Sequence, residues 1–81
     1  MPPGEGILKN LSTPLGFGKL LRDARVRAGL SQTTLGQRCG VAKPTLSRYE
    51  NGHVLPSLAT FLRLALALSV DPMSLIDFSK L

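Results

Sequence analysis

The chain has 81 residues and a mass of 8.7 kDa, so it can form one small domain and has little room for a deep catalytic cleft. Its 10 Lys and Arg residues outnumber its 5 Asp and Glu residues, and the net charge is +5. One Cys and one His argue against an internal disulfide, a metal site and a catalytic triad. The longest apolar-rich run, residues 58–70, is too short to cross a bilayer. We therefore expect a soluble, cytoplasmic protein that is no enzyme and needs no metal or cofactor.

The basic residues are concentrated in the middle of the chain. Residues 19–48 hold seven basic side chains and one acid, a net charge of +6, whereas residues 1–18 are neutral and residues 49–81 carry −1. A basic block in an otherwise neutral domain is typical of a surface that binds a polyanion. A solvated helix face has the same composition, so charge alone leaves both interpretations open.

The first predicted helix follows a tail. Residues 1–12 contain prolines and glycines without apolar periodicity, which indicates a flexible segment. Thr13 followed by Pro14 is a typical helix start, because the Thr side chain can cap the first turn and Pro needs no hydrogen-bond partner there. The apolar spacing that follows predicts a helix ending at Gly29. Gly18 and a neighbouring glycine weaken its start, at about 1 kcal/mol each in a helix interior.

Four more helices follow, each with a cap, a proline or a glycine at one end. Their predicted ranges are 32–39, 43–51, 58–68 and 72–78. Ser31, Ser57 and Asp71 are expected to cap the first, third and fourth of them, whereas Ala42 is a poor cap for the second. No alternating strand pattern occurs in the sequence. Residues 13–81 are therefore predicted to form one all-α domain of five short helices.

Residues 32–49, QTTLGQRCGVAKPTLSRY, have the pattern of two short helices that cross at a tight turn. Gly36 lets the second helix approach the first closely, and Gly40 can adopt the positive φ of a sharp turn. The apolar side chains that bury the inner face are Leu35, Val41, Leu46 and Tyr49. The remaining side chains of the second helix point outward, and a polar, basic outer face on a short helix suits the major groove of DNA.

Four segments, GLSQ, GV, LSRYENG and PSL, follow one another in register. On these segments the chain resembles the phage repressor and Cro-type helix-turn-helix proteins, the XRE family, over about residues 15–76. The resemblance implies a compact five-helix domain like that of the phage lambda repressor. The family consists mostly of bacterial or phage transcription regulators that bind operator DNA as dimers. Double-stranded DNA and a second copy of the chain are thus the implied partners.

The resemblance also implies roles for individual residues. The base-facing positions are Lys43, Pro44, Thr45 and Arg48, with Ser47 at their edge. Contacts to DNA phosphates are implied for Gln32 and expected for Thr33, Asn51 and Arg22. Pro44 replaces a residue that is usually polar in the family, so we expect it to contact a thymine methyl group or to sense DNA shape. Arg25 and Glu50 are implied to form a partly buried ion pair that joins the first helix to the end of the third.

The helix predicted at residues 58–68 has more apolar surface than one core face needs. One face carries Leu58, Phe61, Leu64, Ala65 and Leu68 at the spacing of a buried stripe. Leu66 lies about 130° from the centre of that stripe. We expect a self-association surface formed by Leu62, Leu66, Ile76 and Phe78. In the alternative, Ile76 and Phe78 pack on the domain's own core.

Several functions are compatible with this pattern. The leading one is a sequence-specific transcription regulator that binds double-stranded DNA as a dimer. The alternatives are an antitoxin that also binds a protein toxin, a restriction–modification controller protein, and a module that binds only proteins. A copurifying protein would point to the antitoxin, loss of binding to every duplex would point to the protein-only module, and the gene neighbourhood would separate the remaining regulators.

Overall fold

The computed structural model describes residues 13–80, so the tail predicted at residues 1–12 lies outside the described part. The described residues form four α-helices and two short 3-10 helices, with no strand among them. In chain order the elements are α2 (Pro14–Arg27), α3 (Gln32–Cys39), α4 (Lys43–Glu50), α5 (Leu58–Leu68), η1 (Pro72–Leu75) and η2 (Phe78–Lys80). The all-α prediction is confirmed, whereas the count of five α-helices is not.

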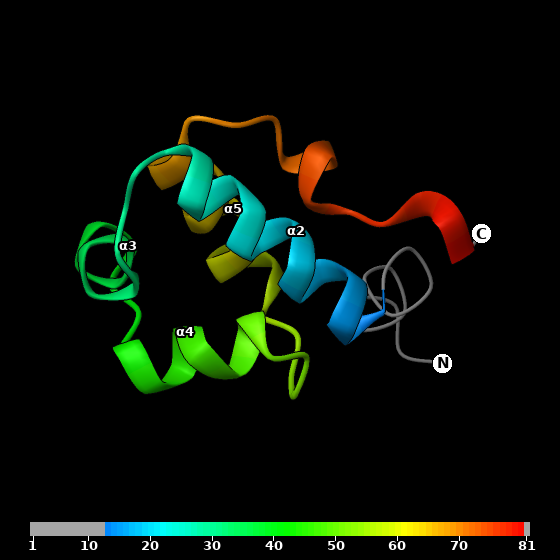
Figure 1. The fold of residues 1–81 in the computed structure, drawn as a ribbon, viewed down its shortest axis with the longest axis horizontal. Helices are drawn as coiled ribbons and strands as arrows, with labels where there is room; N and C mark the ends of the chain where they lie inside the picture. Colours follow the sequence, from blue (N-terminus) through cyan, green and yellow to red (C-terminus); the bar gives the residue numbers. More distant parts are fainter. Residues whose placement is uncertain (1–12, 81) are drawn as a thin grey trace.

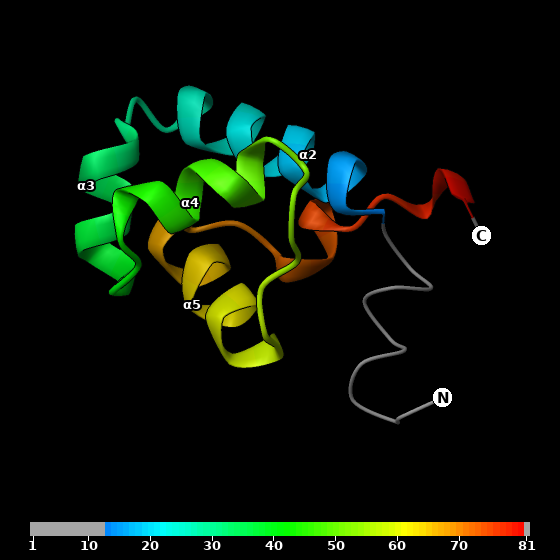
Figure 2. The ribbon, with the colours of Figure 1, turned by 90° about the horizontal axis from the view of Figure 1, so that it is seen from below.

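The four helices enclose one core. α2 packs on α4, and α3 packs on both α4 and α5, while η1 closes the core against α2 and α5. Figures 1 and 2 show α3 at one end of the molecule, with the start of α2 and the carboxyl-terminal segment at the opposite end. Each of the four α-helices therefore contributes one face to the core and leaves the other face outside.

Three of the four helices begin with the side-chain cap that the sequence predicts. Thr13, Ser31 and Ser57 each accept a hydrogen bond from the backbone N–H three residues later, at 3.0–3.2 Å. These bonds satisfy N–H groups that have no partner inside the helix. Ala42 at the start of α4 provides no such bond. The position of α4 therefore depends on contacts with the rest of the domain.

The core is aliphatic with two Phe rings and one Tyr ring. Its buried apolar residues are Phe17, Leu21, Ala24, Leu35, Cys39, Leu46, Tyr49, Phe61, Leu64, Ala65, Leu68, Leu75 and Ile76. The rings of Phe17 and Phe61 join α2 to α5, with centroids 6.0 Å apart. Leu58 was expected on the buried stripe, but it is 57% exposed because it is the first residue of α5 and lies beyond the edge of the core.

Gly18 has a packing role that the sequence did not indicate. A Cβ atom at this position would come within 2.6 Å of the backbone oxygen of Glu50. The expected destabilisation of the helix start is therefore offset by a close approach of α2 to the end of α4, which only glycine permits. The same approach brings the ion-pairing residues of α2 and α4 together.

The carboxyl-terminal helix predicted at residues 72–78 is shorter than expected. Asp71 caps its start as predicted, accepting a hydrogen bond from Met73 N at 3.0 Å. The turn is nevertheless a four-residue 3-10 helix, because Ile76 adopts an extended backbone and turns its side chain into the core. Ile76 is 8% exposed, so it does not contribute to an exposed self-association surface.

Candidate nucleic-acid interface

α3 and α4 form two helices that cross at a short turn. Gly40 ends α3 in the left-handed conformation, and Val41 N donates to Gly36 O at 2.9 Å across the turn. A Cβ atom on Gly36 would overlap the carbonyl oxygen of Val41. Only glycine permits this approach, so Gly36 and Gly40 together determine the direction in which α4 follows α3.

α4 has one buried face and one outer face. Leu46, Tyr49 and Glu50 are buried, and Tyr49 is thus a core residue rather than a ring available for base stacking. The exposed side chains are Lys43, Pro44, Thr45 and Arg48. Ser47 is half-buried at the edge between the two faces. The residues predicted to face bases therefore share the outer face of a helix whose other face is held by the core.

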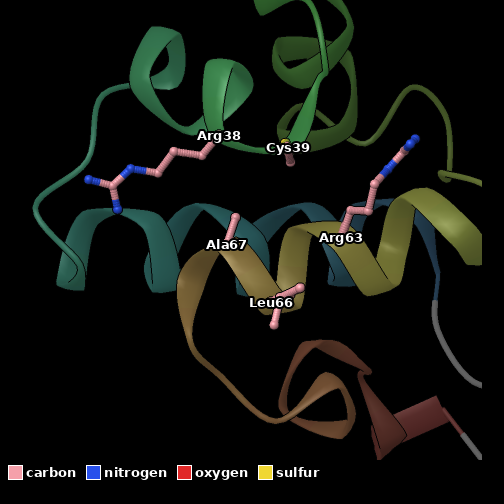
Figure 3. A pocket seen from close by; sticks show the side chains of 5 residues that line it. All are labelled: Arg38, Cys39, Arg63, Leu66 and Ala67. Atoms are coloured by element: carbon pink, nitrogen blue, oxygen red, sulfur yellow. The ribbon is translucent and has the colours of Figure 1, made fainter.

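Two further arginines lie away from this face. Arg38 on α3 and Arg63 on α5 border a shallow surface pocket of about 260 Å³ (Figure 3). Its other lining residues are Cys39, Leu66 and Ala67, so no residue of α4 takes part. Burial raises the pKa of the Cys39 thiol, whose Sγ donates to Leu35 O at 3.1 Å. This thiol is a packed, protonated core group.

The residues predicted to contact phosphates lie on three elements. Thr33 is exposed on α3 and Arg22 is exposed on α2. Asn51, directly after α4, is exposed and donates from Nδ2 to Ser47 Oγ at 3.2 Å. Gln32, the first residue of α3, is half-buried. Three of the four residues predicted to contact phosphates are therefore exposed, and Gln32 is half-buried.

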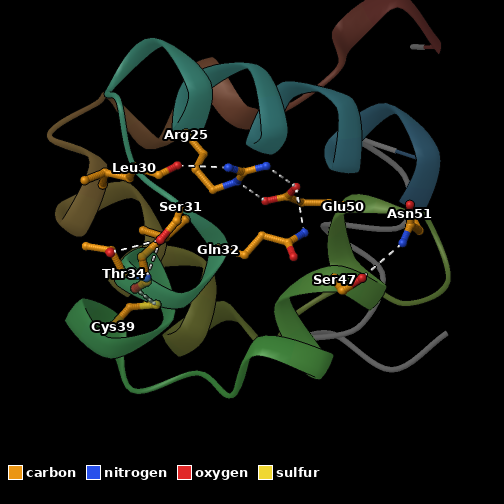
Figure 4. Close-up of polar contacts among 10 residues, drawn as sticks. Arg25, Leu30, Ser31, Gln32, Thr34, Cys39, Ser47, Glu50 and Asn51 are labelled. Carbon is orange, nitrogen blue, oxygen red and sulfur yellow. Dashed lines mark hydrogen bonds and ion pairs between the residues drawn. The ribbon is translucent and has the colours of Figure 1, made fainter.

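Arg25 and Glu50 form an ion pair between α2 and α4 (Figure 4). Arg25 Nε donates to Glu50 Oε2 at 2.7 Å and Nη2 donates to Oε1 at 3.0 Å, while Nη1 donates to Leu30 O at 2.9 Å. The side chains are 14% and 3% exposed. The hydrogen bond to Glu50 raises the pKa of Arg25, so the guanidinium stays charged.

Gln32 takes part in the same cluster, which the sequence did not indicate. Its Nε2 donates to Glu50 Oε1 at 3.2 Å, as Figure 4 shows. The two residues are 18 positions apart in the sequence, and no sequence pattern links them. Only the three-dimensional structure reveals their contact. The cluster links α2, α3 and α4 through one carboxylate.

A second exposed surface lies on α5. Leu58, Leu62 and Leu66 follow at intervals of four residues, and all three are exposed, with Leu66 at 81%. Phe78 is also exposed. We call Leu58, Leu62 and Leu66 the α5 stripe.

Residues 13–80 contain neither a candidate metal site nor a candidate membrane-spanning helix. No group of three or more His, Cys, Asp or Glu side chains is placed to hold a metal ion. No helix in this part of the chain is long and apolar enough to cross a membrane.

Known proteins share this architecture. Residues 17–75 match the family model of the helix-turn-helix domain. The ImmF control region 10 kDa protein of Bacillus phage phi105 is 37% identical over 55 residues, which cover 68% of this chain and 61% of the phage protein. This chain therefore spans less than two thirds of that relative.

Two solved structures extend the comparison. The restriction-modification controller protein C.AhdI from Aeromonas hydrophila is 37% identical with a TM-score of 0.74, over 76% of this chain and 94% of the controller. An HTH_3 family transcriptional regulator from Vibrio cholerae is 27% identical with a TM-score of 0.73, over 78% of this chain and 35% of that protein. The chain belongs to the helix-turn-helix domain family and is similar to its phage and XRE-type members.

Proposed function

We propose that the chain is a sequence-specific transcription regulator that inserts the outer face of α4 into the major groove of double-stranded DNA. The observation that carries the proposal is the division of α4 into a core-facing side and an exposed side with two cations. A short helix of this kind fits the major groove, where each base pair presents a distinct pattern of donors and acceptors.

The exposed side chains of α4 differ in what they can read. Arg48 can donate two hydrogen bonds to O6 and N7 of a guanine, a contact worth about 1–3 kcal/mol of discrimination. Lys43 can donate to a guanine or a phosphate, and Thr45 offers a hydroxyl and a methyl group. Pro44 has no N–H, so its ring suits a thymine methyl group. Ser47 lies at the edge of this set.

Phosphate contacts are assigned to polar groups around α4. Gln32 and Thr33 open α3, where free backbone N–H groups favour an anion. Asn51 follows α4, and Arg22 adds a cation from α2. Such contacts position the helix without reading sequence, and those made by cations make the affinity fall steeply with salt.

The regulator is proposed to act as a homodimer on a two-fold operator. The α5 stripe and Phe78 offer exposed apolar surface for a second copy, and this surface includes the predicted residues Leu62 and Leu66. A two-fold dimer places its half-sites about one helical turn apart, roughly 10–10.5 base pairs. Regulation would follow from where the dimer sits relative to the polymerase.

Selection of bound duplexes from a random pool tests the proposal. We expect the chain to enrich a two-fold motif, and Arg48→Ala to lose the guanine preference at one position of each half-site. Arg63→Ala is the matched control, because it removes an exposed arginine that lies on α5. Failure to enrich any duplex would overturn the proposed function, and an unchanged motif with Arg48→Ala would overturn the role of Arg48.

A restriction–modification controller is the second candidate. It is favoured by the 37% identity with C.AhdI over 94% of that controller. A controller of this kind is expected to bind the promoter of its own gene. Binding of the purified chain to the duplex upstream of its own coding sequence, and not to an unrelated promoter, would support this candidate.

A further inference from the structure

Glu50 is a buried carboxylate that the proposed DNA contacts do not use. It is 7% exposed at the end of α4. Its two oxygens accept three hydrogen bonds, two from Arg25 and one from Gln32 (Figure 4). The carboxylate is thus the point at which α2, α3 and α4 meet through polar contacts.

The charge of Glu50 dictates the orientation of the Gln32 amide. An ionised carboxylate can only accept hydrogen bonds, and that of Glu50 lies against the guanidinium of Arg25 at 2.7 Å. Gln32 must therefore turn its NH2 group, and not its carbonyl oxygen, towards Glu50. Without this partner the amide is able to rotate by 180°, which exchanges a donor for an acceptor.

The orientation matters because an amide NH2 group has two donors. One of them is used by Glu50 Oε1, at 3.2 Å between the heavy atoms. The other remains on the half-buried side chain at the first position of α3. A DNA phosphate accepts hydrogen bonds and donates none, so the NH2 group of Gln32, and not its carbonyl oxygen, has to make the proposed phosphate contact.

Arg25 supports the arrangement from α2. Its guanidinium donates hydrogen bonds to both oxygens of Glu50 and a third hydrogen bond to the carbonyl oxygen of Leu30. These bonds hold the carboxylate in place beside Gln32. The positive charge of Arg25 also offsets the negative charge of Glu50, which would otherwise repel a nearby phosphate.

We propose that Glu50 is a positioning residue for DNA binding, which holds the Gln32 amide so that its second N–H donates to a DNA phosphate. The inference rests on the proposed function, because it needs a duplex bound at the start of α3. It assigns to the ion pair between Arg25 and Glu50 a role in binding in addition to its role in stability.

A double-mutant cycle tests this role. The full chain and the variants Gln32→Ala, Glu50→Gln and their combination are titrated with a duplex selected by the full chain, at a temperature at which circular dichroism shows each one folded. We expect Gln32→Ala to weaken binding about tenfold, as for the loss of one hydrogen bond to a charged group. Glu50→Gln should weaken binding about fivefold alone and less than twofold in the Gln32→Ala background. The same loss in both backgrounds is the result of a purely structural role and would overturn the proposal.

Gln37 provides the matched control, because it is an exposed glutamine on the same helix and makes no hydrogen bond with Glu50. The effects of Gln37→Ala and Glu50→Gln should be additive, whatever Gln37→Ala does alone. Coupling between these two would show that Glu50→Gln disturbs α3 as a whole, and it would overturn the specific assignment.

Two further outcomes are decisive. If Glu50→Gln does not fold, Glu50→Asp replaces it in the cycle, since it keeps the charge and withdraws the carboxylate from Gln32 by one methylene. If the unaltered chain enriches no duplex, the proposed function and this inference fall together. If it binds a duplex and the cycle is additive, only the role of Glu50 is overturned.

Discussion

The outer faces of α4 and α5 differ although both helices pack on the same core. α4 presents exposed cations, Lys43 and Arg48, whereas the α5 stripe presents only leucine side chains. An exposed cation is well hydrated. A contiguous apolar stripe is unfavourable in water, and association with another apolar surface would bury it. The two faces therefore suit different partners, a polyanion for α4 and another apolar surface for α5.

The two helices also differ in how they are held. α5 has a side-chain cap at Ser57 and buries Phe61, Leu64, Ala65 and Leu68 on one face. α4 has no side-chain cap, and its end is fixed by the ion pair of Glu50 with Arg25. The end of α4 thus depends on polar contacts in addition to the burial of Leu46 and Tyr49, whereas α5 is held by packing.

The largest expected effect concerns the α5 stripe. Leu66→Glu places a charge on each side of the proposed two-fold interface, and burial of each leucine is worth about 1.5–3 kcal/mol. The dimer dissociation constant should therefore rise at least about a hundredfold. Sedimentation over a range of concentrations measures this change.

Val26→Glu is the control for Leu66→Glu, since Val26 is an exposed apolar residue on α2 outside the stripe. It should leave the dissociation constant unchanged. A chain that stays monomeric at every concentration, or a dimer insensitive to Leu66→Glu, would contradict the assignment of α5 to self-association.

The second effect concerns the anchor of α4. Glu50→Gln leaves the mostly buried guanidinium of Arg25 without its charged partner, and breaking such a pair costs about 3–5 kcal/mol of unfolding free energy. Urea unfolding followed by circular dichroism measures the loss. Asp23→Asn makes the same chemical change on the exposed side of α2 and should shift stability by less than about 0.5 kcal/mol. Equal stabilities of the two variants would show that α4 is held by packing alone.

Helices whose ends depend on local signals could be predicted from the sequence. The ranges of α3 and α5 agree with the prediction to the residue, because a serine cap stands at the start of each. The carboxyl-terminal helix could not be predicted as well. Its start depends on the local Asp71 cap, but its end depends on the burial of Ile76 among distant residues. Gly18 likewise has only an unfavourable local signal, since its close approach to the end of α4 depends on how the two helices pack.

The candidate site was predictable to the same extent. The periodicity of α4 alone separates the exposed Lys43 and Arg48 from the buried Leu46 and Tyr49. The contact of Gln32 with Glu50 has no local signal, because it depends on how α3 packs against α4. Faces of helices therefore follow from spacing, whereas polar contacts between helices require the three-dimensional arrangement.

A third prediction sharpens the charge contrast between the helices. If Lys43 neutralises a DNA phosphate, Lys43→Ala should weaken binding about tenfold and reduce the slope of log K against log salt by about 0.9. Lys19→Ala removes an equally exposed lysine from α2 and should leave the slope unchanged. Fluorescence anisotropy at salt concentrations from about 50 to about 200 mM measures the affinity and the salt slope of both variants. A lower affinity with an unchanged slope would instead place Lys43 on a base.

The smallest effect concerns Cys39, which lies where α3 packs on α5. Burial raises the pKa of its thiol in the folded chain. Below the ordinary thiol pKa the group is protonated in both states, so its contribution to stability is fully present there. Above that pH the unfolded chain loses the proton first, and the free energy of unfolding falls until the folded pKa is passed. Between about pH 8 and 9.5 the unaltered chain should therefore lose a few tenths of a kcal/mol more than Cys39→Ala does. Because all lysines and Tyr49 are present in both chains, parallel stability curves would mean that folding does not raise the pKa of the Cys39 thiol.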